Sequence, residues 1–174
     1  MFYFATASRL IAIATLSGAA VLGSMVNGVA KASGDPSTLM GMLPQGFSPS
    51  NCQQATPEPP ALEKVTCDQS TDSDGPTSAL FALYGNLDDL ATKFQSAGSK
   101  MTAASSCPGD QQSPGPWTYG SSGKTGGQVE CGSISDSNTT LAVVMWTDNS
   151  KLRAAVVTGP NISTLYQWWK TKSG

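Results

Sequence analysis

A cysteine, an apolar strand and a capped helix occur twice in this chain, and this repetition constrains the fold more than any other feature. The longer copy covers residues 131–169 and the shorter copy covers residues 67–94. Each predicted helix begins after an asparagine, Asn86 or Asn161, a residue type that caps helix N-termini well. The repetition predicts two similar halves, each built around a strand that leads into a helix.

The two predicted helices match position by position. In each of them, apolar residues lie on one helical face at the spacing i, i+3 and i+7. The matched pairs are Asn86 and Asn161, Leu87 and Ile162, Leu90 and Leu165, and Phe94 and Trp169. We therefore expect two amphipathic helices that pack on the core, and Gly98 is a suitable stop for the first of them.

Five apolar segments have the length and composition of β-strands: residues 62–67, 77–84, 128–131, 140–147 and 152–158. Turn residues at 148–151 join the last two segments into a hairpin. Residues 53–61 contain three prolines and are expected to form an extended surface loop. The sequence therefore predicts an α+β fold, with an antiparallel sheet of about five strands and two helices on one face.

Two isolated apolar groups are expected to pack against this core. Residues 39–43 should form one amphipathic turn, and Phe47 should be buried beside it. Trp117 lies in a segment rich in proline and glycine. We favour packing of Trp117 over a disulfide, and the alternative is an exposed binding platform.

The N-terminal residues 1–32 resemble a secretory signal peptide. Arg9 supplies the positive charge, an apolar stretch follows, and Ala30-Lys31-Ala32 matches the small-residue cleavage pattern. The mature protein is then expected to begin at Ser33, with residues 33–174 forming one exported domain. The alternative is an uncleaved membrane anchor, because the apolar stretch approaches the roughly 20 residues that span a bilayer.

The chain has 4 cysteines, and all of them follow this leader. An even number of cysteines in an exported protein favours disulfides, and four cysteines allow three connectivities. We favour Cys52–Cys67 with Cys107–Cys131, because each disulfide then lies within one half of the repeat. No CxxC sequence is present, which disfavours both a zinc site and a redox site.

Composition excludes several classes of function. The sequence has no histidine, the commonest general base and metal ligand, and we expect neither a metal nor a cofactor. The net charge of -2, without clustered Lys and Arg, disfavours a nucleic-acid partner. Residues 120–125 end in Gly-Lys-Thr, but they lack the first glycine of a P-loop and the strand–helix context, and are better described as a hairpin tip.

A resemblance rests on several short motifs. These are GF-SPSNC, LEKVTC, DGPTSALFALY, SPGPW, GQVECG, MWTDN and LYQWW, and the match covers nearly everything from Leu39 to Lys170. In this series the chain resembles the extracellular C-terminal domain of some actinobacterial membrane-bound Ser/Thr protein kinases, and small exported proteins that carry this domain alone. The resemblance implies an extracytoplasmic sensor-like or binding module, and it supplies neither a ligand nor catalytic residues.

Three aromatic residues are the candidates for a ligand groove. Trp169 shares a helical face with Ile162 and Leu165 and should be buried, whereas Trp168 is expected to be half exposed. With Tyr166 and Trp146, Trp168 would line a groove for a peptide, glycan or lipid. The alternative is that these aromatic residues only fill the core.

Three functions follow as hypotheses. The first is a secreted or cell-envelope binding or sensor-like domain without catalytic activity, whose partner is a small ligand, glycan, lipid or protein of the envelope. The second is a cell-envelope hydrolase that uses Ser and Lys or paired carboxylates. The third is a structural or host-interaction exported protein. A membrane partner is expected only if the leader remains uncleaved.

Overall fold

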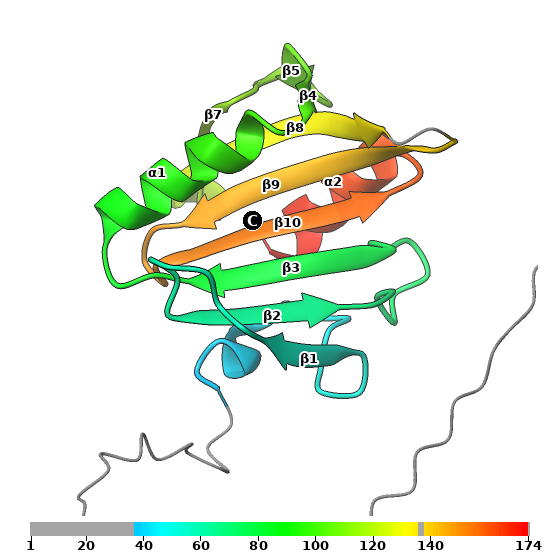
Figure 1. Ribbon diagram of the computed structural model, residues 1–174. Helices are drawn as coiled ribbons and strands as arrows, with labels where there is room; N and C mark the ends of the chain where they lie inside the picture. The colour runs from blue at the N-terminus through cyan, green and yellow to red at the C-terminus, as the bar shows by residue number, and fades with distance from the viewer. Residues whose placement is uncertain (1–36, 136–137, 174) are drawn as a thin grey trace, which may run out of the picture. The chain divides into compact units, whose positions relative to one another are not determined.

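A twisted antiparallel sheet with one helix on each face forms the centre of the protein (Figure 1). The structure, a computed structural model, describes residues 37–135 and 138–173. The predicted signal peptide, its cleavage site and the alternative membrane anchor lie outside these residues. The described part belongs to one compact unit, residues 34–174. None of its helices combines the length and the hydropathy needed to cross a membrane.

The main sheet has eight strands rather than the five expected. All of its neighbouring strands run antiparallel. Its order is β1 (Cys52–Ala55), β2 (Glu63–Cys67), β3 (Ser78–Leu83), β10 (Arg153–Gly159), β9 (Thr140–Asp148), β8 (Thr125–Ser135) and β4 (Thr102–Ala103), and β7 (Gly115–Thr118) also pairs with β8. A separate pair consists of β5 (Ser106–Cys107) and β6 (Gln111–Gln112).

The five predicted strands are the five contiguous central strands, β2, β3, β10, β9 and β8, and the missed strands flank them. The expectation of a loop over residues 53–61 is wrong at its beginning, because residues 53–55 belong to β1. The prolines start only at Pro57, so the preceding amides are free to pair with β2. Strand β7 contains Pro116, which has no amide hydrogen to donate. A proline is tolerated here because β7 pairs with only one strand, β8.

Both helices begin where the sequence predicts. Helix α1 (Leu87–Gly98) is capped by Asn86, whose side chain accepts a hydrogen bond from the Asp89 amide at 2.9 Å. Helix α2 (Ile162–Lys172) is capped by Asn161, which accepts from the Ser163 amide at 2.9 Å and from the Thr164 amide at 3.1 Å. These side chains satisfy amides that have no partner within the helix.

The expectation that both helices lie on one face is wrong, because α1 and α2 cover opposite faces of the sheet (Figure 1). Leu90 of α1 clusters with Ala82, whereas Leu165 of α2 clusters with Phe81. Neighbouring residues of a strand point to opposite faces, so the two clusters lie on opposite sides of β3. The two halves are therefore similar in the order of their elements, but their helices do not share a face.

The buried face of α1 also differs in detail from the prediction. It contains Leu90, Phe94 and Gly98 at the spacing i, i+4 and i+8. Leu87 lies beside this stripe rather than within it and is 51% exposed. The i, i+3, i+7 pattern therefore identified the helix correctly but included one residue that is not part of the core.

The core on the α2 side is dominated by aromatic rings. Phe81 packs edge-on against Phe47 at 5.6 Å and against Trp146 at 6.4 Å. Trp117 is 4% exposed, so it belongs to this core rather than to an exposed platform, and the same cluster contains Cys107 and Cys131. The segment before β1 adds the short helix η1 (Met40–Met42), and the predicted docking of this segment and burial of Phe47 are confirmed.

Both predicted disulfides are confirmed. Cys52 and Cys67 face each other across β1 and β2, and their disulfide fastens the edge strand to its neighbour. Cys107 and Cys131 connect β5 to β8. The predicted hairpin tip is also confirmed, since the short helix η2 (Gly120–Ser122) lies between the paired strands β7 and β8.

A buried ion pair lies at the turn between β9 and β10. Asp148 is 0% exposed and Arg153 is 2% exposed, and their closest charged atoms are 3.8 Å apart. Asp148 also receives hydrogen bonds from the Tyr119 hydroxyl at 2.6 Å and the Ser150 hydroxyl at 2.8 Å. Arg153 donates a hydrogen bond to the Met42 carbonyl oxygen, so this cluster links the β9–β10 turn to the N-terminal segment.

Acidification is expected to reduce stability through Asp148. Burial by itself raises the pKa of Asp148, but hydrogen bonds from Tyr119, Ser150 and Lys151, with the positive charge of Lys151, bring the pKa below its ordinary value. An unfolded aspartate has a pKa of about 3.9. The stabilisation is therefore complete above about pH 5 and is lost as the pH falls through about 3.9 towards the lower folded pKa.

Urea unfolding between pH 7 and pH 2.5 measures this effect. The free energy of unfolding of the Asp148→Asn variant should depend less on pH than that of the wild type over the acidic part of this range. Identical pH profiles for the two proteins would show that Asp148 does not titrate with a lowered pKa.

Candidate functional site

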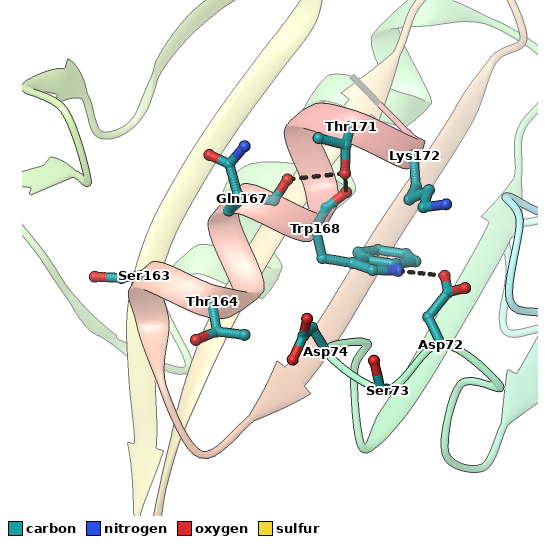
Figure 2. Close-up of a pocket in the computed structure, with 9 residues that line it drawn as sticks. All are labelled: Asp72, Ser73, Asp74, Ser163, Thr164, Gln167, Trp168, Thr171 and Lys172. Atoms are coloured by element: carbon teal, nitrogen blue, oxygen red, sulfur yellow. Dashed lines mark hydrogen bonds between the residues drawn. The ribbon is translucent and has the colours of Figure 1, made fainter.

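A polar hollow of about 650 Å³ lies between α2 and the loop that joins β2 to β3 (Figure 2). It combines one face of the helix with three consecutive loop residues, and Trp168 lies between them. The lining residues are Asp72, Ser73, Asp74, Ser163, Thr164, Gln167, Trp168, Thr171 and Lys172. We call this site the polar hollow.

The helical wall of the polar hollow follows from the periodicity of α2. Ser163, Thr164, Gln167 and Thr171 lie on one face, because residues three and four apart are neighbours on a helix. The Thr171 hydroxyl donates to the carbonyl oxygens of Gln167 at 3.1 Å and Trp168 at 3.0 Å (Figure 2). The Gln167 side chain extends from an exposed position of the helix, where it can reach a ligand.

The loop wall is fixed by hydrogen bonds to its surroundings. The Ser70 amide donates to the Pro76 carbonyl oxygen at 2.9 Å, and the Thr71 amide donates to the Gly46 carbonyl oxygen at 3.0 Å. Gly46 has a φ of 93°, and a Cβ at this position would lie 2.7 Å from Asp72 Oδ2. A glycine is therefore required where the N-terminal segment supports the loop.

Trp168 connects the two walls. Its indole Nε1–H donates to Asp72 Oδ2 at 3.0 Å (Figure 2). Its ring packs edge-on against Phe47 at 5.8 Å. The expectation that Trp168 is half exposed is wrong, since only 4% of its surface is accessible. Phe47 and the loop that contains Asp72 are distant from Trp168 in the sequence, and together they cover its ring. Helical periodicity alone could not predict this burial.

The structure does not bring the three predicted aromatic residues into one groove. Trp146 is 0% exposed and lies between Phe81 and Trp169. Tyr166 is buried against Trp169 at a ring distance of 5.2 Å, and it lines a different hollow of about 390 Å³ near Trp117. Burial raises the pKa of the Tyr166 hydroxyl above its usual value. Of the three, Trp168 lines the polar hollow.

The sequence by itself did not identify Asp72 and Asp74 as members of a site, nor the polar face of α2. The signal for that face is the spacing of Ser163, Thr164, Gln167 and Thr171, which is visible once the helix is placed. Nothing in the sequence indicates that the β2–β3 loop lies against this face, because that contact depends on tertiary structure.

The chemistry of the polar hollow is that of hydrogen bonding. The carboxylates accept, the lysine donates, and the amide and hydroxyl groups do both. Lys172 Nζ donates a hydrogen bond to Gln45 Oε1 at 2.9 Å. A hydrolase that uses Ser and Lys would need a hydrogen bond between these two residue types, and Lys172 makes none to a serine within the described residues. The described part of the chain contains no group of three or more His, Cys, Asp and Glu side chains arranged to hold a metal ion.

Comparisons with known proteins do not identify the chain. No family model, no curated protein and no solved structure matches it.

Proposed function

We propose that this protein is an extracytoplasmic, non-catalytic binding domain that holds a carbohydrate in the polar hollow. The observation that carries the proposal is the Trp168–Asp72 hydrogen bond, which places a carboxylate beside the polar face of α2. The two disulfides support an oxidising, extracytoplasmic location. The resemblance to sensor-like domains of membrane-bound kinases supports a binding role rather than a hydrolase.

The mixture of groups in the polar hollow favours a carbohydrate among the envelope ligands considered. A sugar carries many hydroxyl groups that both donate and accept, which suits carboxylates, an amide and hydroxyl side chains placed together. Asp72 and Asp74 disfavour an anionic ligand such as a phosphate, because like charges repel. An acyl chain would leave these polar groups without partners, at a cost in free energy.

Replacement of Gln167 by alanine is expected to weaken carbohydrate binding by about two- to tenfold, since one lost hydrogen bond typically costs about 0.5–1.5 kcal/mol and tenfold corresponds to about 1.4 kcal/mol. Gln167 is exposed, so the variant should unfold at the same temperature as the wild type. The measurement is a glycan-array screen of the wild type, followed by calorimetric titration of the best ligand.

Gln53→Ala is the matched control, because Gln53 is equally an exposed glutamine but lies on the edge strand β1. Its affinity should equal that of the wild type. The proposal fails if the wild type binds no glycan on the array, or if both variants bind the glycan as tightly as the wild type does.

A further inference from the structure

A third hollow, of about 520 Å³, lies beside the C-terminal half of α1. The apolar residues Phe94, Met101, Ala103 and Pro114 line it, together with the uncharged polar residues Gln95, Ser99 and Gln128. Glu130 of β8 is the only charged side chain among the described residues that line it. We call this site the Glu130 hollow. It shares no residue with the polar hollow, and the inference below does not depend on carbohydrate binding.

Glu130 is mostly buried, with only 6% of the residue exposed, and its carboxylate oxygens are open to the hollow rather than sealed in the core. None of the ion pairs between described residues includes this carboxylate. Its Oε2 atom lies directly below Gly98, where a Cβ would approach it to 2.5 Å. Helix α1 therefore passes over the carboxylate, and a glycine makes this close approach feasible.

An unpaired buried carboxylate weakens a fold, because the charged form loses its hydration and gains nothing in return. Burial accordingly raises the pKa of Glu130 above its usual value. A hydrophobic residue or a glutamine would avoid this cost. The carboxylate acquires a partner if a ligand supplies a positive charge.

We propose that the Glu130 hollow binds an organic ammonium ion, with the cationic nitrogen at Glu130 and the apolar substituent against Phe94, Met101 and Pro114. Three features of the hollow agree on this class of ligand. The carboxylate attracts a cation, the C-terminal end of α1 contributes partial negative charge, and an aromatic residue, Phe94, lines the hollow. The apolar walls select an ammonium ion with a hydrocarbon group over a small inorganic cation.

Calorimetric titration with benzylammonium and with benzyl alcohol tests this proposal at pH 8. The two probes have nearly the same shape, and they differ in charge. We expect benzylammonium to bind at least tenfold more tightly than benzyl alcohol. Equal affinity for the two probes, or no detectable binding of benzylammonium, would overturn the proposal.

Glu130→Gln separates ligand binding from fold stability. The variant should lose the preference for benzylammonium, while its unfolding temperature rises because a buried charge has been removed. Glu58→Gln is the matched control, since the Glu58 side chain is exposed, and the preference should remain in this variant. A preference that persists in Glu130→Gln would contradict the proposal.

A second variant tests the apolar part of the hollow with Glu130 in place. Ala103 is exposed on the short strand β4 and lines the hollow, so Ala103→Leu should fill part of the space without disturbing the core. We expect benzylammonium to bind at least tenfold more weakly to this variant. Unchanged affinity would place the ammonium ion elsewhere on the protein.

Discussion

Replacement of Asp148 by alanine is expected to lower the free energy of unfolding by about 3–5 kcal/mol, the usual cost of breaking a buried ion pair. Asp148 is the only acidic side chain within ion-pair distance of Arg153 in the described residues, and Arg153 is 2% exposed. Removing the carboxylate leaves the guanidinium buried and without a counter-charge. It also deprives Tyr119 and Ser150 of a hydrogen-bond acceptor. Urea unfolding at pH 7 measures the loss.

Arg153→Met, alone and combined with Asp148→Ala, completes a double-mutant cycle. The double variant should recover much of the stability lost in Asp148→Ala, because neither buried charge then remains unpaired. Asp68→Ala is the control, since Asp68 is exposed and its loss should change stability by less than about 0.5 kcal/mol. Strictly additive effects of the two substitutions would mean that the pair does not act as a unit.

Trp146→Ala is the second substitution with a large expected effect, about 3–5 kcal/mol. Trp146 is 0% exposed near the end of β9 and contacts the rings of Phe81 and Trp169. Its removal leaves a cavity that the surrounding strands and α2 cannot close without shifting. Denaturant unfolding with tryptophan-independent detection, such as circular dichroism at the amide wavelengths, measures the effect.

Trp146→Phe serves as the comparison for this substitution. The indole Nε1–H of Trp146 has no hydrogen-bond partner within the described residues, so phenylalanine removes a polar group that gains nothing in the core. The loss of stability should therefore be much smaller than in Trp146→Ala. If Trp146→Ala instead kept its full stability and lost ligand binding, Trp146 would belong to a binding site rather than to the core.

The centre of the fold could be predicted from the sequence because its signals are local. The helix caps Asn86 and Asn161, the apolar run of β3 and the turn after Asp148 each depend on neighbouring residues. Turn chemistry and strand composition therefore located the five central strands. The disulfides followed from the assignment of each cysteine pair to one half of the chain.

Features that depend on distant contacts could not be predicted in this way. The strands β1, β4 and β7 are short, and pairing rather than composition defines them. The face that each helix covers depends on the path of its connection to the sheet, which a helical stripe does not reveal. Aromatic character suggested a groove at Trp168, but the loop that covers it lies far away in the sequence.

The environment of Glu130 could likewise not be predicted from the sequence. Alternation along β8 places Glu130 on the face opposite Val129 and Cys131. A glutamate at such a position is ordinarily solvated, and only the passage of α1 above it makes it a buried charge. The sequence therefore contains the residue, and the tertiary structure supplies its environment.

The position of β10 in the sheet has a consequence for the order in which the protein folds. β10 pairs with β3 on one side and β9 on the other, yet residues 153–159 follow β3 by almost half the chain. Phe81 and the aromatic cluster around it cannot be enclosed until this strand is inserted. Folding dominated by such long-range pairing is slow, so the sheet should close late in folding.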